Sequence, residues 1–350
     1  MTDNIDLSCP LPGQQYPRVV LAHGGGGRLM LRLIDDCFRR AFDNPLLNRQ
    51  GDGACFELNG STAMSSDAFT VSPLFFPGGD IGSLAIHGTA NDLAMCGARP
   101  RYFSASFILE EGLPMADLQT LVNSMAAAAS TAGITIVTGD TKVVERGKCD
   151  GLYITTTGIG ELLAGARARP PGPEQIEAGD CIIVSGPVGD HGTAIMSLRE
   201  NLAFEEPLLS DAAPLFPAVR ALYDADIPVH CLRDPTRGGL ATLLNELASG
   251  ARLGVRVAEA TIPVRPAVHD ACELLGLDPL YVACEGRFVA VLPSTGATRA
   301  VEVLKQCGCD QAAVIGEFNA EHPGTVVLEN RIGGSRVLDL LSGEQLPRIC

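Results

Sequence analysis

The chain has 350 residues, of which 46% are hydrophobic, and its formal net charge at pH 7 is -15. This length predicts two domains, each with a core of its own. The negative charge argues against nucleic acid or an anionic membrane as a main partner. No apolar run is long enough to cross a bilayer and the acidic N-terminus does not resemble a signal peptide, so we expect a cytoplasmic protein. The 12 cysteines include no C-x-x-C pair, and most are expected to be reduced core residues.

A run of glycines follows the first apolar stretch. Residues 19–22 lead into His23 and then into Gly24, Gly25, Gly26 and Gly27, after which residues 29–34 have helical spacing. Successive glycines let backbone N–H groups converge on phosphate oxygens at the start of a helix. Neither the P-loop motif nor the dinucleotide motif is present, so a nucleotide site here must belong to another design. His23 has two alternatives, a contact to phosphate or a cap on the loop.

Hydrophobic periodicity predicts mixed strands and helices in the first half. Strands are expected at residues 55–58, 63–71, 102–107, 134–137 and 153–157, and helices at 81–97 and 114–133. Asp80 is expected to be an N-cap, because it precedes the first of these helices. Asp92 lies on that helix among apolar residues, where an acid is costly to bury without a cation or a partner. Residues 138–142 are expected at the end of the strand that precedes them.

A proline-rich stretch at residues 166–179 predicts the boundary between two domains. The second half starts with a strand at 181–184 and a turn at 185–192, which contains His191 with the same two alternatives as His23. Residues 233–239 precede an amphipathic helix that Gly250 is expected to cap. Strands at 255–257, 288–291 and 313–315 alternate with helices at 266–275 and 297–307. Mixed elements in both halves predict an α/β or α+β fold.

Four aspartates lie at the ends of predicted elements beside small residues: Asp67, Asp92, Asp140 and Asp234. Mg²⁺ prefers oxygen ligands and usually shares its coordination sphere with waters and substrate phosphates. Together with the glycine run, these acids predict an ATP–magnesium site. Each acid taken alone fits a helix cap or a turn equally well.

The chain ends in Pro347-Arg348-Ile349-Cys350. Gly333-Gly334-Ser335 and Gly343 are expected to be flexible joints, and the apolar residues between them are suited to docking on a domain. The pattern predicts an arm that carries a reactive thiol at its tip. Taken alone, a frayed terminus with an incidental cysteine is the more ordinary interpretation.

Longer motifs in this chain resemble the HypE family of hydrogenase maturation proteins. They are Ser66-Asp67, Phe76-Pro-Gly-Gly-Asp-Ile-Gly82, Asn91-Asp-Leu-Ala94, Thr138-Gly-Asp-Thr-Lys-Val-Val144 with Arg146-Gly147, Arg233-Asp-Pro-Thr-Arg-Gly-Gly239, and the terminal Pro347-Arg-Ile-Cys350. The aspartate motifs alone are similar to the wider aminoimidazole-ribonucleotide synthetase-like superfamily. The longer motifs and the terminal cysteine favour HypE, and the resemblance extends from His23 to Cys350.

The resemblance implies two PurM-like α/β domains followed by a flexible tail. We divide the chain into an N-terminal segment (1–44), an ATP-binding and dimerisation domain (45–165), a second domain (166–335) and the tail (336–350). The resemblance also implies a homodimer and an ATP-dependent carbamoyl dehydratase that uses Mg²⁺. A HypF-type transferase would carbamoylate Cys350, and ATP-driven dehydration would give a thiocyanate. A HypC–HypD complex would accept the cyanide on iron.

The implied chemistry assigns catalytic roles to Cys350, Glu285 and Lys142. Glu285 is the candidate base that removes N–H protons, and Lys142 would polarise the carbamoyl group or hold phosphate. The aspartates Asp67, Asp92, Asp140 and Asp234 would bind the metal, and the nucleotide contacts would come from His23, Gly24, Gly25, Gly26, Gly27, Asn91, Asp140, Thr141 and Arg237. A surface Glu–Lys pair is the alternative for the first two roles. A structural salt bridge is the alternative for Arg237.

The chain departs from the family pattern in two places. The loop is all glycine where relatives often carry Ser or Thr, and Ser66-Asp67-Ala68 replaces the commoner Thr-Asp-Ser. Selenophosphate synthetase and the purine-pathway synthetase are rival enzymes, but Cys9 is not followed by the lysine that the first requires, and the second needs no terminal cysteine. A non-catalytic carrier or scaffold is the alternative from another class. The aspartates argue against it, because a carrier needs no metal–nucleotide site.

Overall fold

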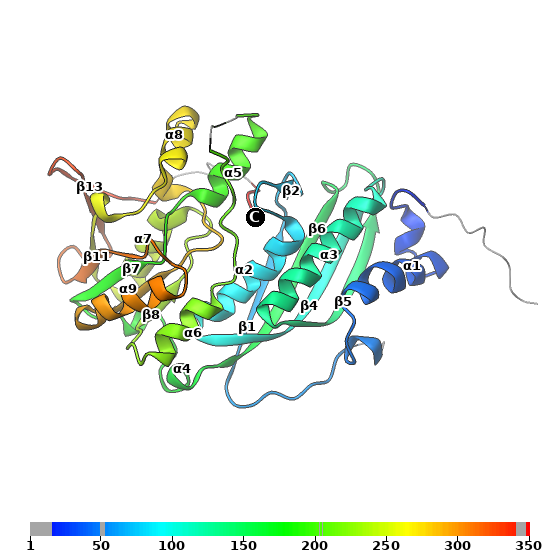
Figure 1. Ribbon diagram of the computed structural model, residues 1–350, viewed down its shortest axis with the longest axis horizontal. Coiled ribbons are helices and arrows are strands. Elements are labelled where there is room, and N and C mark those ends of the chain that lie inside the picture. Colours follow the sequence, from blue (N-terminus) through cyan, green and yellow to red (C-terminus); the bar gives the residue numbers. More distant parts are fainter. Residues whose placement is uncertain (1–15, 50–52, 203, 205, 341–347) are drawn as a thin grey trace, which may run out of the picture.

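The computed structural model describes residues 16–49, 53–202, 204, 206–340 and 348–350. Two α/β halves lie side by side, and the C-terminal residue lies between them, beside α2 (Ile81–Met95) (Figure 1). Cys9, Gly343 and Pro347 fall outside the described residues. No helix in the described part of the chain is long and apolar enough to cross a membrane.

The first half is built on a four-stranded sheet in the order β1-β6-β4-β5. Its strands are β1 (Thr62–Phe69), β4 (Ala98–Glu110), β5 (Thr135–Val144) and β6 (Leu152–Leu162). β4 and β5 run parallel and are joined by α3 (Met115–Ala132), whereas β6 pairs antiparallel with both β1 and β4. Helices α2 and α3 lie next to each other on one face of the sheet (Figure 1). Between the helices and the sheet lies an apolar core that includes Leu84, Phe103 and Leu121.

The ends of both helices follow from their flanking residues, as predicted. Asp80 caps α2: its Oδ1 accepts the Ser83 N–H at 2.9 Å, and the Ser83 hydroxyl oxygen accepts the Asp80 N–H at 3.2 Å. Gly133 ends α3 in the left-handed conformation, with φ of 68°. Before α2 come the short strands β2 (Phe75–Phe76) and β3 (Gly79–Asp80). The chain begins with α1 (Arg28–Leu33) and a π-helical continuation over Ile34–Arg39.

The second half is built on a seven-stranded sheet in the order β13-β12-β9-β11-β7-β10-β8. Its strands are β7 (Asp180–Val184), β8 (Cys231–Arg233), β9 (Gly254–Ala258), β10 (Val289–Pro293), β11 (Ala313–Asn319), β12 (Val326–Glu329) and β13 (Ser335–Val337). The helices are α4 (Ala164–Ala168), α5 (Asp190–Arg199), α6 (Phe216–Asp224), α7 (Gly239–Ala251), α8 (Pro266–Leu275) and α9 (Ala297–Gln306).

Alternate residues of β7 face opposite sides of this sheet, as the strand period requires. Ile182 and Val184 pack in the apolar cluster that contains α7, whereas Ile183 packs in the cluster that contains α6 and α9. Ala94 and Met95, at the end of α2, belong to this second cluster. The two halves therefore share an apolar contact through α2, next to Asp92.

Two strand predictions were wrong in detail. Residues 55–58 join no sheet in the described part of the chain, although they alternate in exposure as a strand would. Phe56 packs its ring on Tyr102 instead, with centroids 4.3 Å apart. Residues 138–142 lie inside β5 and not at its end, because pairing with β4 continues to Val144.

Two other predictions were wrong: the Gly250 cap of α7 and the flexible joint at residues 333–335. Helix α7 runs past Gly250 and ends at Ala251, and Arg252, which adopts φ of 55°, is its C-cap in place of the glycine. The expected joint at residues 333–335 is a tight turn between β12 and β13, in which the Asn330 Oδ1 accepts the N–H groups of Ile332 (3.2 Å) and Gly334 (2.7 Å). Since β13 pairs with β12 and Leu338 is fully buried, the first residues of the predicted tail lie in the second half.

Candidate active site between the two halves

Three of the predicted aspartates converge where the halves meet. Asp67 lies on β1, Asp92 on α2 and Asp234 directly after β8. The Thr89 hydroxyl donates to Asp67 at 2.7 Å, and the Ser65 hydroxyl donates to Asp92 at 2.5 Å. Burial raises the pKa of Asp92 and of Asp234, and the charges of the neighbouring aspartates raise both further. The cluster is therefore an acidic site that a bound cation would stabilise.

Glu285 is buried beside this cluster. Glu285 is only 3% exposed, and its Oε1 has no hydrogen-bond partner among the described residues. Its N–H donates to the Asp211 Oδ1 at 3.0 Å. Burial, followed by the charges of Asp234 and Asp211, raises the Glu285 pKa well above its ordinary value. A carboxylate with a raised pKa is a stronger base than an exposed one, which suits it to accept a proton in the site.

The last residues of the chain lie along residues 70–72, which follow β1. The Thr70 N–H donates to the terminal carboxylate of Cys350 at 3.0 Å, and the Ser72 N–H donates to the Arg348 carbonyl at 3.4 Å. The Arg348 guanidinium donates in return to the Thr70 carbonyl, at 3.0 and 3.2 Å. Ile349 is buried in the core of the first half. The terminal residues are thus docked in a strand-like arrangement that uses backbone groups of the first half.

The docked Cys350 thiol lies near groups of both halves. Burial raises the pKa of this thiol to about 12; the charge of Glu285 and then that of Asp67 raise it as well, whereas Arg237 lowers it. The charges of Glu285, Arg237 and Asp67 therefore all act on the sulfur atom. Arg237 is exposed and lines a polar cavity with Asp234, at the start of α7. The thiol therefore lies within the electrostatic influence of two carboxylates and a guanidinium.

The predicted glycine loop lies elsewhere, against β5. A Cβ atom on Gly24 would stand 2.8 Å from the Val143 nitrogen, and Gly26 has φ of 73°, so both positions favour glycine. His23 caps the loop with one ring nitrogen, because its Nδ1 accepts the Val20 N–H at 3.0 Å. Burial lowers the His23 pKa, so the ring is neutral at pH 7.

Asp140 and Lys142 also lie on β5, and they pair with each other. The Lys142 Nζ is 2.8 Å from the Asp140 Oδ2, and Lys142 is the largest cause of the lowered Asp140 pKa. The register Asp67↔Thr156, Thr156↔Ala105 and Ala105↔Gly139 crosses the whole sheet. Three strand spacings, about 14 Å, therefore separate β1 from β5. Within one chain, neither Asp140 nor Lys142 joins the acid cluster or Cys350, contrary to the predicted single site.

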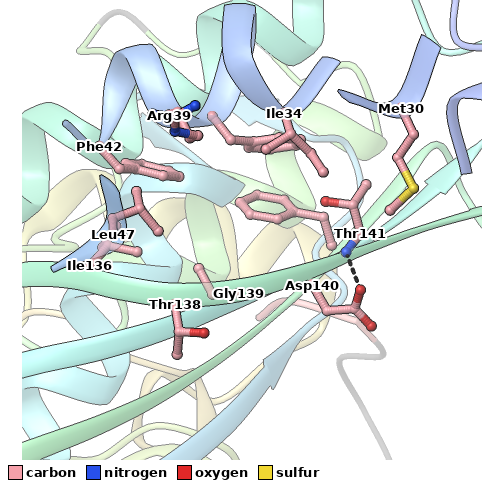
Figure 2. A pocket seen from close by; sticks show the side chains of 13 residues that line it. Met30, Ile34, Arg39, Phe42, Leu47, Ile136, Thr138, Gly139, Asp140 and Thr141 are labelled. Atoms are coloured by element: carbon pink, nitrogen blue, oxygen red, sulfur yellow. Dashed lines mark hydrogen bonds between the residues drawn. The ribbon is translucent and has the colours of Figure 1, made fainter. Parts of the chain in front are cut away.

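A largely apolar cavity opens beside β5 (Figure 2). Met30, Ile34, Phe42 and Leu47 line it from the N-terminal helices, and Asp140 lines it from the strand. Thr141, a predicted nucleotide contact, also lines this cavity, and its N–H donates to the Asp140 Oδ1 at 2.8 Å (Figure 2).

Asn91, another of the predicted nucleotide contacts, joins the two halves. Its amide nitrogen donates to the carbonyls of Ala213 and Glu285, each at 3.1 Å, and its amide oxygen accepts the Leu215 N–H at 2.9 Å. Because both ends of the buried amide are engaged with backbone, the structure gives Asn91 a positioning role for Glu285.

Comparison with known proteins identifies the family. Residues 50–162 match the N-terminal domain of the AIR synthase related proteins, and residues 177–329 match their C-terminal domain. The carbamoyl dehydratase HypE of Azotobacter vinelandii is 52% identical over 339 residues, which cover 95% of this chain and 97% of that protein. The chain belongs to the HypE family.

Solved HypE structures have the same fold. A crystal structure of the hydrogenase maturation protein HypE in complex with ATP is 50% identical to this chain, with a TM-score of 0.91, and covers 95% of this chain and 99% of that one. A chain from a HypE–HypF complex is 43% identical, with a TM-score of 0.77, and covers 88% of this chain and 99% of that one. The two-domain PurM-like fold is thereby confirmed, while the domain boundaries stay a prediction.

Several residues of this HypE family member that hold the docked terminus were not singled out from the sequence. The Arg199 guanidinium donates to the Ser72 carbonyl at 2.6 Å and also to the Arg348 carbonyl. Arg348 forms an ion pair with Asp150 at 2.7 Å, and its guanidinium lies 5.7 Å from the centre of the Tyr153 ring. No spacing rule connects these residues, because they come from four separate segments. Only the chain terminus that they hold carried a sequence signal.

Proposed function

We propose that this chain is an ATP-dependent carbamoyl dehydratase that acts on an S-carbamoyl group carried by its own Cys350. The observation that carries the proposal is the docked terminus: the Thr70 N–H, three residues after Asp67, donates to the Cys350 carboxylate at 3.0 Å, and the charges of Glu285, Arg237 and Asp67 act on the pKa of the Cys350 thiol. The relatives support it, because one is named carbamoyl dehydratase HypE and a solved HypE binds ATP. The cyanide so formed would serve the iron of a nickel–iron hydrogenase.

The reaction divides into phosphorylation and elimination. The carbamoyl oxygen attacks the terminal phosphorus of ATP, and ADP leaves. The C–O bond then breaks, the oxygen leaves with the phosphate, and the nitrogen loses both protons to give the S–C≡N group. Atoms balance, because the two protons, the oxygen and the transferred phosphoryl group together make dihydrogen phosphate. Phosphorylation is needed because an amide oxygen is otherwise a poor leaving group.

Glu285 takes the protons from nitrogen in this scheme. Its carboxylate is buried, its Oε1 has no hydrogen-bond partner among the described residues, and its charge raises the pKa of the Cys350 thiol. Arg237 lines a polar cavity with Asp234 and would hold a phosphate oxygen. A cation among the neighbouring acids would favour the ionised form of Glu285, which is the form that accepts a proton.

The acid cluster fits Mg²⁺ in its chemistry. No three His, Cys, Asp or Glu side chains are placed to hold a metal ion in the described part of the chain. The charge of Asp67 nevertheless raises the pKa of Asp92, the charges of Asp92 and Asp67 raise that of Asp234, and a divalent cation would relieve this repulsion. These three would hold the ion, which would neutralise charge on the phosphates of ATP.

We also propose a homodimer whose two copies share each site. Asp140, Lys142 and the glycine loop lie across the sheet from the acid cluster, so a second chain is needed to bring them near it. Met64 and Ile108 point away from α2 and are 68% and 41% exposed, which leaves an apolar sheet face for that contact. Mixing Asp92→Asn with Lys142→Ala protein should restore partial activity through mixed dimers. No recovery, with exchange of subunits demonstrated, would place each site in a single chain.

The solved HypE–HypF complex supports a HypF-type carbamoyltransferase as the partner that loads Cys350. A HypC–HypD complex would take the cyanide, and the setting would be the cytoplasm. The decisive experiment follows the intact mass of the protein after incubation with the transferase and carbamoyl phosphate, and again after addition of ATP and Mg²⁺. Gain of one carbamoyl on the C-terminal peptide, followed by loss of one water only with ATP, is expected. Carbamoylation without that loss would leave a carrier.

Two substitutions test the catalytic residues. Glu285→Gln and Lys142→Ala should leave carbamoylation of Cys350 intact and block its dehydration, because both act after the transfer. Glu329→Gln is the matched control for the first, since Glu329 lies on β12 and pairs with Arg256 at 3.5 Å. Dehydration at the wild-type rate in either variant would remove that residue from the mechanism.

A further inference from the structure

We propose that His191 is a positioning residue for dehydration: its ring N–H holds the Ile349 carbonyl and thereby sets where the Cys350 thiol lies. The inference rests on the proposed function and adds a residue to it. His191 is the second residue of α5 and is fully buried. Its Nε2 lies 2.9 Å from the Ile349 oxygen, and its Nδ1 lies 2.7 Å from the Ser210 Oγ.

The partners fix the tautomer of the ring. A carbonyl oxygen only accepts hydrogen bonds, so Nε2 must carry the hydrogen. Burial lowers the His191 pKa, the ring is neutral, and Nδ1 therefore accepts the Ser210 hydroxyl hydrogen. The Ser210 oxygen in turn accepts the Ala212 N–H at 3.1 Å. In this chain of hydrogen bonds the Ser210 hydroxyl donates to His191 Nδ1, and the His191 Nε2–H donates to the Ile349 carbonyl of the docked terminus.

The Ile349 carbonyl belongs to the peptide bond that leads into Cys350. Once His191 holds this carbonyl and Thr70 holds the terminal carboxylate at 3.0 Å, both polar groups that flank the Cys350 Cα are fixed. Little backbone freedom then remains to move the sulfur away from its docked position. Thr70 belongs to the first half and His191 to the second, so the position of the sulfur depends on both halves.

The contact between the halves supports the same role. The Ser210 N–H donates to the Pro77 carbonyl at 2.8 Å, and the ring of Phe76 meets the His191 ring edge-on, with centroids 5.6 Å apart. His191 is therefore held by the first half as well as by its own helix. Transfer of a carbamoyl group from a partner needs access to the thiol and no contact with His191, so the two steps should respond differently to its loss.

Two variants separate the hydrogen bond from the shape of the ring. His191→Phe keeps an aromatic ring against Phe76 but removes the donor, whereas His191→Gln keeps an N–H at a similar reach. His269→Phe is the control, because His269 is a half-exposed histidine of α8 that pairs with Glu273 at 3.7 Å. Thermal unfolding of each protein reports whether it folds.

Single-turnover dehydration of the carbamoylated protein is measured by mass with ATP and Mg²⁺. Loss of one buried hydrogen bond predicts about a tenfold slower dehydration in His191→Phe, with carbamoylation unchanged and most of the rate recovered in His191→Gln. Alkylation of the unmodified Cys350 by iodoacetamide should be faster in His191→Phe than in wild type. Equal dehydration rates and equal alkylation rates in folded His191→Phe and wild type would overturn the role. If wild type itself fails to dehydrate, the proposed function falls, while the alkylation rates still decide whether His191 holds the terminus.

Discussion

Arg348 is the side chain that ties the terminus most directly to the first half, and its removal should expose the thiol. In Arg348→Ala the two hydrogen bonds to Thr70, the ion pair with Asp150 and the contact with the Tyr153 ring are lost. The partners of the ion pair are 40% and 51% exposed, so that pair contributes little. Together the contacts stabilise the docked state by about 2 kcal/mol once this exposure is allowed for.

That energy converts into a measurable rate. A loss of about 2 kcal/mol shifts the docking equilibrium by a factor of about 30. The docked thiol has a pKa raised from 9.0 to about 12. At any pH below 9 the docked thiol is therefore ionised about a thousandfold less than the thiol of a free tail. This factor is the largest increase in alkylation rate that undocking can produce. Alkylation of Cys350 at pH 8 should be about 30 times faster in Arg348→Ala if the wild-type terminus is mostly docked.

The assay uses timed iodoacetamide labelling followed by digestion after glutamate, which releases residues 345–350 and separates Cys350 from the other cysteines. Arg336→Ala is the matched control, because Arg336 lies on β13 and pairs with Asp278 at 2.8 Å, away from the site. An unchanged rate in Arg348→Ala, or an equal increase in Arg336→Ala, would refute the reasoning.

Two further predictions concern stability. In the absence of divalent cations, unfolding free energy should fall as pH rises from about 4 to about 7, because the folded protein keeps protons on Asp92 and Asp234 that the unfolded chain releases at lower pH. Denaturant titrations at several pH values should show a flatter dependence in Asp234→Asn, and a steeper one would contradict the assignment. Asn91→Ala should cost about 2–4 kcal/mol, since it leaves three backbone groups without their partners, and should slow dehydration by displacing Glu285. An unchanged unfolding midpoint and rate would show that Asn91 does not join the halves.

Elements that obey a local rule were predictable from the sequence. Helices α2 and α3 were placed by their apolar spacing, Asp80 and Gly133. Residues 55–58 show the limit of such rules. Their exposure alternates as in a strand, but a strand also needs a neighbouring strand with unpaired backbone groups, and no local sequence pattern encodes that neighbour. The acid motifs predicted a single site for four aspartates. Within one chain the sheet order separates Asp140 from the other three, because β5 and β1 occupy opposite edges, and this order depends on contacts between distant segments.

The residues that hold the terminus were unpredictable for a similar reason. Asp211 holds Glu285 from a loop that has no recognisable motif, and His191 had two alternatives that spacing did not separate. The docked terminus itself became predictable only through the resemblance, because a final cysteine is ordinarily an incidental one.

The pairing of β13 with β12 limits how far the substrate can travel. Leu338 is buried at the end of this pairing, and from Leu340 to Arg348 the backbone spans at most about 28 Å, since each residue adds no more than about 3.5 Å. A thiol confined to so small a volume has an effective concentration near the millimolar range at its own site. A free peptide with the same ending would have to exceed that concentration to compete. Each chain therefore turns over one tethered substrate at a time, and partners must come to the protein to load or unload it.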